Sequence, residues 1–134
     1  MCDMLDEEKR VEKRIVAEND KFLCFVPFCG KMAFEVYIVP KRHAAGIEKL
    51  TEEEIESFAD IMHTVLNKVK QVFSHISYNI CFQDLTKSDD IKVKHWYVRI
   101  LPRIGSPAGY EFGTGTYINH ILPEYAAEHY KKLK

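Results

Sequence analysis

The sequence lacks any run of apolar residues near the roughly 18 that a membrane-spanning helix requires, and it has no leader with a basic start and an apolar middle. It also lacks an excess of one charge, because 19 lysines and arginines oppose 20 aspartates and glutamates. A net charge of -1 creates no field that would gather nucleic acid or an anionic membrane. We therefore expect a cytoplasmic protein with neither nucleic acid nor a membrane as partner.

The sequence has no Cys-x-x-Cys pair; its four cysteines are Cys2, Cys24, Cys29 and Cys81. In a cytoplasmic protein this pattern predicts free thiols rather than a disulfide framework. Cys2 is unusual because it lies at the very start. It would fit either a free thiol or the second half of a Cys-x-x-Cys motif whose first half lies before residue 1.

No internal repeat or low-complexity linker divides the chain, so residues 1–134 are expected to form one domain. Residues 1–13 are expected to form a charged N-terminal arm or a short surface helix, and the charge run at 7–13 is expected to be solvated. Apolar and alternating segments predict five strands, at 14–19, 22–26, 34–39, 77–83 and 93–101. A polar loop is expected at 85–92, and Pro123 opens a short C-terminal helix.

The best-defined element is a helix over residues 52–73. Thr51 and Glu54 form a capping box at its start, and large apolar residues recur at spacings of three and four. Such a helix needs a sheet face to cover its apolar stripe. The order of strands, helix, strands and helix predicts an α+β fold, with a meandering antiparallel sheet packed on one long helix.

The most informative segment is residues 95–103, His-Trp-Tyr-Val-Arg-Ile-Leu-Pro-Arg. As a strand it directs His95, Tyr97 and Arg99 to one face, about 7 Å apart, and apolar residues to the other. Arg99 offers a charged fork for an anion or for a buried ion pair. His95 is suited either to a phosphate contact or to a bond with a backbone carbonyl. Tyr97 is either a ligand donor or a half-buried structural residue.

This segment resembles the signature strand of the histidine triad family, in which three histidines alternate with apolar residues before a proline. Other segments are similar, in order and spacing, to the C-terminal half of galactose-1-phosphate uridylyltransferases. They are residues 14–19, 25–28, Phe34-Glu35, Pro40-Lys41-Arg42-His43, 108–111 and the helix start at 123–127. The resemblance implies a histidine-triad-like fold. In such proteins the segment that contains His43 is largely structural.

The resemblance also implies which activities are absent. The family's nucleophile is the middle histidine, which is Tyr97 here, and its His-Pro-His motif does not occur in this chain. The family's histidine metal site in this half matches Gln83, Tyr97 and Arg99, which cannot rebuild it. We therefore predict no catalytic residue, no metal and no cofactor. Tyr110 and Glu111 match the family's hexose contacts, and Gln83 is a further candidate ligand contact.

The function that follows is a non-catalytic or catalytically reduced domain of this family. It would bind a sugar phosphate or nucleotide sugar and support dimerisation. Its expected partners are a second copy of itself or a separate N-terminal uridylyltransferase half. The alternative is a standalone nucleotide hydrolase or nucleotidyltransferase of the histidine triad type with an altered triad, so whether the chain is an enzyme stays open.

Overall fold

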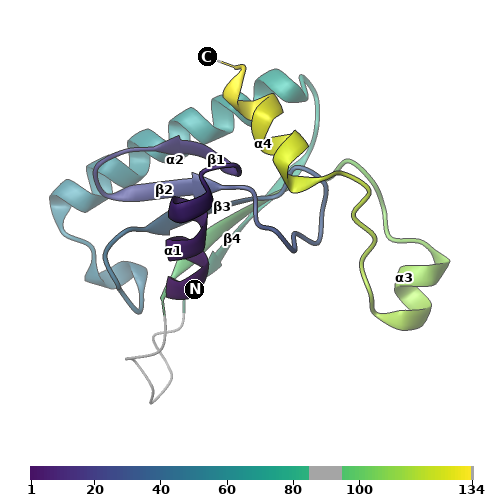
Figure 1. Cartoon of the computed structure of the whole chain (residues 1–134), viewed down its shortest axis with the longest axis horizontal. Helices are drawn as coiled ribbons and strands as arrows, with labels where there is room; N and C mark the ends of the chain where they lie inside the picture. Colours follow the sequence, from purple (N-terminus) through teal and green to yellow (C-terminus); the bar gives the residue numbers. More distant parts are fainter. Residues whose placement is uncertain (85–94, 134) are drawn as a thin grey trace.

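The computed structural model describes residues 1–84 and 95–133 (Figure 1). Along the chain, its elements are α1 (Cys2–Val11), β1 (Ile15–Glu18), β2 (Phe22–Phe25), β3 (Val36–Pro40), the 3₁₀ turn η1 (Ile47–Lys49), α2 (Glu52–Val72), β4 (Tyr78–Gln83), β5 (Tyr97–Pro102), α3 (Gly109–Thr114) and α4 (Pro123–Lys131). None of the helices in this part of the chain is both long and apolar enough to cross a membrane.

The strands form one antiparallel sheet in the order β1-β2-β3-β5-β4, which confirms the predicted α+β fold. The order departs from a sequential meander at one place, where β5 lies between β3 and β4. This arrangement brings Tyr37 of β3 opposite Arg99 of β5, and Gln83 of β4 opposite Tyr97. The polar loop predicted at 85–92 lies outside the described residues.

The main core lies on the face of the sheet that α2 and α4 cover. Buried residues of β2, β3 and β5 meet Ile61, Val65 and Val69 of α2. Thr51 and Glu54 form both bonds of the predicted capping box at the start of this helix. Most of the predicted apolar stripe packs as expected, but Ile55, in the first turn of the helix, is 53% exposed.

Helix α1 covers part of the opposite face. Its Leu5 packs with Leu23, Phe25 and Val39, and Tyr37 and Tyr97 border this second cluster. The prediction that residues 7–13 are solvated is wrong at Glu8, which is 1% exposed. The reason is Arg14, whose guanidinium nitrogen lies 3.0 Å from the Glu8 carboxylate. Burial nevertheless raises the pKa of Glu8 above its ordinary value.

Residues 103–122 leave the body of the domain as an arm that carries α3 (Figure 1). Residues 110–119 are rich in aromatic residues and glycine, and the sequence predicts no helix here. The helix forms because Glu111 accepts a bond from the backbone N–H of Ala108, at 2.9 Å, and Gly115 ends it in the left-handed region with φ 69°. Several apolar side chains of the arm are exposed; Phe112 is 79% exposed.

Candidate functional site

The altered triad position on β5 is occupied by an ion pair. Nε and Nη2 of Arg99 lie 2.8 Å and 2.7 Å from the same carboxylate oxygen of Glu35. Glu35 is fully buried, and its other oxygen accepts backbone N–H bonds from Lys31 and Met32, at 2.8 Å and 3.2 Å. The guanidinium therefore neutralises a buried carboxylate of the same domain, which is one of the two roles that the sequence leaves open for Arg99.

Two tyrosines complete this cluster. The rings of Tyr37 and Tyr97 lie 5.0 Å apart, and the Arg99 guanidinium lies over the Tyr37 ring at 5.7 Å. Burial, together with the negative charge of Glu35, raises the pKa of Tyr37 to about 12. The Tyr37 phenol therefore stays protonated at neutral pH, and a protonated phenol is a weak nucleophile. The packing of Tyr97 corresponds to the half-buried structural residue that the sequence allows.

His95 lies just before β5. It is 3% exposed, and its Nε2 lies 2.8 Å from the carbonyl oxygen of Pro40. A carbonyl can only accept, so the neutral ring carries its proton on Nε2 and its lone pair on Nδ1. Burial lowers the pKa of His95, which favours this neutral form. The Nδ1 atom is turned toward Cys2 Sγ, at 3.4 Å.

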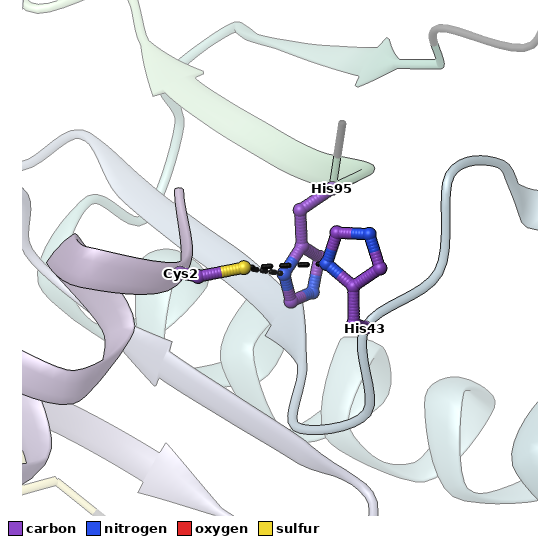
Figure 2. Close-up of side chains that lie close together, drawn as sticks. All are labelled: Cys2, His43 and His95. Atoms are coloured by element: carbon purple, nitrogen blue, oxygen red, sulfur yellow. Dashed lines mark hydrogen bonds between the residues drawn. The ribbon is translucent and has the colours of Figure 1, made fainter. Parts of the chain in front are cut away.

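Cys2, His43 and His95 come from three parts of the chain and converge on one point, as Figure 2 shows. Cys2 Sγ lies 3.2 Å from His43 Nδ1 and 3.4 Å from His95 Nδ1, and the potential ligand atoms all lie within 4.8 Å of one another. A tetrahedral zinc ion with ordinary bond lengths holds sulfur and nitrogen ligands about 3.6 Å apart. The three side chains therefore fit a divalent metal of the zinc type.

The chemistry of these donors supports the same assignment. Thiolate and imidazole are the ligands that zinc prefers, and a ring nitrogen bonded to a backbone carbonyl is the usual outer partner of a metal-bound histidine. His43 is exposed, so an ion can reach the cluster from solvent. Without an ion, the same geometry is a chain of hydrogen bonds in which the Cys2 thiol donates to His95 Nδ1. The sequence predicts no metal ligands in this chain, and it therefore misses this cluster.

A cavity of about 180 Å³ opens where the arm meets the loop before β3. Its polar lining includes Lys31, Glu111, Tyr117 and His120, and the Lys31 ammonium lies 5.1 Å from the centre of the Tyr117 ring. Of the two residues that the resemblance predicts to contact a hexose, Glu111 lines this cavity. Tyr110 is 57% exposed on α3 and is absent from the lining.

The predicted site residues consequently lie in three places. Tyr97, Arg99 and Gln83 lie on adjacent strands of the sheet, and His95 belongs to the cysteine–histidine cluster. Tyr110 and Glu111 lie on the arm. As ligand contacts, all six remain predictions, although Arg99 and His95 already have internal partners. The sequence analysis missed Glu35 as the partner of Arg99, because only the pairing of β3 with β5 brings the two residues together.

Comparison with known proteins shows the family of this chain. Residues 1–105 match the family described as "Galactose-1-phosphate uridyl transferase, C-terminal domain". The chain belongs to this family. Among its relatives, ADP-glucose phosphorylase of Arabidopsis thaliana is 26% identical over 90% of this chain and 35% of its own length. Galactose-1-phosphate uridylyltransferase of Thermotoga maritima is 30% identical over the whole chain and 44% of its own length.

Solved structures of related proteins have the same fold as this chain. The ADP-glucose phosphorylase of Arabidopsis thaliana with bound ADP-glucose superposes with a TM-score of 0.86 at 25% identity, over 94% of this chain and 42% of that one. A uridylyltransferase mutant superposes with a TM-score of 0.89 at 28% identity, over 98% of this chain and 45% of that one. A zinc-bound histidine triad protein of Mycobacterium smegmatis, 15% identical with a TM-score of 0.62, shares the fold.

This domain spans less than half the length of the uridylyltransferase and phosphorylase relatives described above. The family that it matches over residues 1–105 is that of a C-terminal domain.

Proposed function

We propose that this chain is a non-catalytic uridylyltransferase C-terminal-type domain that binds a sugar phosphate, or the sugar end of a nucleotide sugar, and pairs with a second copy of itself. The observation that carries the proposal is the conversion of the triad position into the Glu35–Arg99 ion pair beside two stacked tyrosines. A guanidinium held by a buried carboxylate has a structural role, and it is not a nucleophile.

The loss of covalent chemistry is supported by the positions of the remaining candidate nucleophiles. His95 is the histidine nearest the altered position in sequence, and its nitrogens are already taken up by the Pro40 carbonyl and by Cys2. In-line attack tolerates very little displacement of the attacking atom. This arrangement disfavours the alternative of a histidine-triad hydrolase that uses a substitute histidine.

The cavity beside Glu111 is the place that best fits a sugar. A carboxylate accepts bonds from sugar hydroxyls, an aromatic ring such as Tyr117 covers an apolar sugar face, and Lys31 provides a point charge for phosphate. Its volume of about 180 Å³ is below the range of about 300–1,000 Å³ that is usual for complete ligand sites. It therefore suits one sugar ring, and both relatives' names refer to sugar-nucleotide chemistry.

Calorimetric titration with galactose 1-phosphate and glucose 1-phosphate tests this binding role. We expect Lys31→Ala to weaken binding by about tenfold or more, because it removes a charged hydrogen-bond donor. Glu111→Gln should weaken binding while it keeps an acceptor for the start of α3. Lys49→Ala is the matched control, since Lys49 is an exposed lysine outside the cavity lining. Absence of binding by the wild-type chain would contradict the proposal.

The pairing surface that we propose is β4. This strand ends the sheet, its six residues are Tyr-Asn-Ile-Cys-Phe-Gln, and its ladder with β5 contains no register shift. Edge strands that avoid pairing usually carry charge, proline or a bulge, and β4 has none of these. Tyr78, Ile80 and Phe82 are 43%, 38% and 50% exposed. Two copies of this uncharged strand can pair antiparallel without repulsion, which would continue the sheet.

Light scattering coupled to size exclusion tests this pairing. We expect a dimer for the wild-type chain and a monomer for Ile80→Lys, because a lysine on each copy would place like charges at the strand edge. Ile55→Lys serves as the control, since Ile55 is also exposed but lies on α2. A monomeric wild-type chain that becomes a heterodimer with a separate N-terminal uridylyltransferase half would favour that partner instead.

A second proposal concerns the Cys2–His43–His95 cluster, which we infer is a metal centre with a structural role. Titration with Co²⁺, followed by its thiolate charge-transfer absorption, and elemental analysis for zinc test this site directly. Cys2→Ser should abolish the absorption, whereas Cys29→Ser should leave it unchanged because Cys29 is an exposed thiol outside the cluster. Failure of the wild-type chain to bind either metal would refute the centre.

A further inference from the structure

We propose that the metal centre is a latch for α1: cation binding by Cys2, His43 and His95 determines whether this helix covers the outer face of the sheet. The proposal rests on the inferred metal centre and adds a conformational consequence to it. It does not depend on sugar binding. Its first basis is where the three ligands lie along the chain.

Cys2 is the first residue of α1, whereas His43 and His95 belong to the body of the domain. A cation held by all three side chains would therefore connect the helix to the body (Figure 2). If α1 moves away, the two histidines stay but the thiolate is lost from the site. The docked state thus offers three ligands and the undocked state two, so a cation necessarily favours docking.

The remaining contacts of α1 are few. Only two of its ten residues, Leu5 and Glu8, are buried, and a ten-residue helix is marginal in water without tertiary contacts. Glu8 and its Arg14 partner fasten the C-terminal half of the helix. Leu5 holds the middle, and the Cys2 side chain contacts the body at the N-terminal end. The cluster is therefore positioned to control the half of the helix that is fastened least.

Release of α1 would uncover the surface of the sheet that lies under this helix. Leu23, Phe25 and Val39 are fully buried beneath the helix, and Tyr37 and Tyr97 border them. Figure 1 shows α1 lying across this side of the sheet, with α2 on the other side. Release of α1 would expose this apolar patch, next to the Glu35–Arg99 pair on the same face. The cation would then control access to the side of β5 on which Tyr97 and Arg99 lie.

Hydrogen exchange measured by mass spectrometry tests the latch. The helical amides from Leu5 to Glu12 accept deuterium slowly when α1 is docked, because each is bonded within the helix. We expect the zinc-loaded chain to protect these amides about tenfold or more over the chain treated with EDTA. Amides of α2 should not change, which shows that the domain remains folded.

Two variants and one control distinguish the docking of α1 from the binding of the metal. Cys2→Ser in the presence of zinc should exchange in α1 as fast as the EDTA-treated chain, and Cys29→Ser should match the wild type. Leu5→Ala keeps all three ligands but removes the packing of the helix. Because coupling between docking and cation binding is reciprocal, Leu5→Ala should also weaken Co²⁺ affinity, by about tenfold.

The outcomes distinguish the two proposals. A chain that binds no Co²⁺ refutes the metal centre itself. A chain that binds Co²⁺ while α1 exchanges equally fast with and without the cation keeps the centre and overturns the latch. Unchanged Co²⁺ affinity in Leu5→Ala, with α1 exchange accelerated, would likewise overturn the coupling.

Discussion

Arg99 and Glu35, which are 64 residues apart in sequence, share one ion pair in which two guanidinium nitrogens face a single carboxylate oxygen. The carboxylate is fully buried and the guanidinium side chain is 17% exposed. Glu35, directly before β3, also accepts two backbone bonds from Lys31 and Met32, so the pair joins β5 to the loop that leads into β3. Arg99, at the third position of the triad-like strand, is therefore engaged in an ion pair within the chain.

The ion pair should dominate local stability. Glu35→Ala leaves a poorly solvated guanidinium and two unpaired backbone N–H groups, so we expect a loss of about 3–5 kcal/mol in the free energy of unfolding. Arg99→Ala leaves a buried carboxylate and should cost about 3 kcal/mol. Urea denaturation measures both. Arg10→Ala, which breaks the exposed Arg10–Glu7 pair, is the control and should change stability by less than about 0.5 kcal/mol.

A double-mutant cycle isolates the interaction. Each single variant leaves the partner's charge unpaired. The loss in free energy of unfolding of the double variant should therefore be smaller, by at least about 1.5 kcal/mol, than the sum of the losses of the two single variants. Strict additivity would show that Arg99 and Glu35 act independently, and it would free Arg99 for a ligand role.

The start of α2 should respond to pH through Glu54. Nε and Nη2 of Arg42 donate to the Glu54 carboxylate at 2.8 Å and 2.9 Å, and this contact, assisted by the Thr51 backbone N–H, lowers the pKa of Glu54 from 4.5 to about 2. A depressed pKa stabilises the fold fully above pH 4.5, and the contribution disappears as pH falls through about 2.

Glu54→Gln keeps a side-chain oxygen for the cap but removes the charge. We expect it to be less stable than the wild type at pH 7, by about 1–2 kcal/mol, with the difference shrinking between pH 4.5 and pH 2. Thermal denaturation across this range measures the difference. Glu53→Gln, an exposed neighbour, should show a much smaller change. A pH-independent difference at Glu54 would contradict the assigned ion pair.

A buried hydroxyl contributes to the docking of α4. Tyr130 is fully buried and its hydroxyl donates to the carbonyl oxygen of Phe34, at 3.0 Å. Tyr130→Phe keeps the packing but leaves that carbonyl unpaired, so it should lower the free energy of unfolding by about 1–2 kcal/mol. Tyr125→Phe, on the same helix but 56% exposed, should have almost no effect. Equal effects of the two variants would show that the hydroxyl contributes nothing specific.

A substitution at the C-terminal end of α1 should stabilise the chain. Glu12 ends the helix with φ 58°, in the left-handed region that glycine adopts without steric cost. Glu12→Gly should therefore stabilise the chain by a few tenths of a kcal/mol up to about 1 kcal/mol, as measured by urea denaturation. Lys13→Gly, one residue later, should bring no gain. Destabilisation by Glu12→Gly would mean that its side chain contributes more than its backbone strain costs.

The sequence predicts those parts of the fold that depend on local patterns. The helix α2 follows from the Thr51–Glu54 capping box and from the spacing of its apolar residues, and α4 begins at Pro123 as expected. The alternation of residues in β5 places Tyr97 and Arg99 on one face. These features require information from only a few neighbouring residues.

Long-range partners could not be predicted in the same way. The contacts from Cys2 span 41 residues to His43 and 93 residues to His95, and no spacing rule connects residues so far apart. Glu8 resembles its solvated neighbours in sequence, and only the path of the chain back through Arg14 buries it. The helix α3 is missed because glycine and aromatic residues conceal a cap that Glu111 supplies.

The most direct test of the account is a transfer assay that combines the 134-residue chain with UDP-glucose and galactose 1-phosphate, followed by intact-mass analysis of the protein. With Tyr97 and the Glu35–Arg99 pair at the triad position, we predict no formation of UDP-galactose and no added uridylyl mass on the chain. Exchange above the protein-free rate, or a uridylyl group bonded to any side chain, would contradict the proposal that this chain binds without reacting.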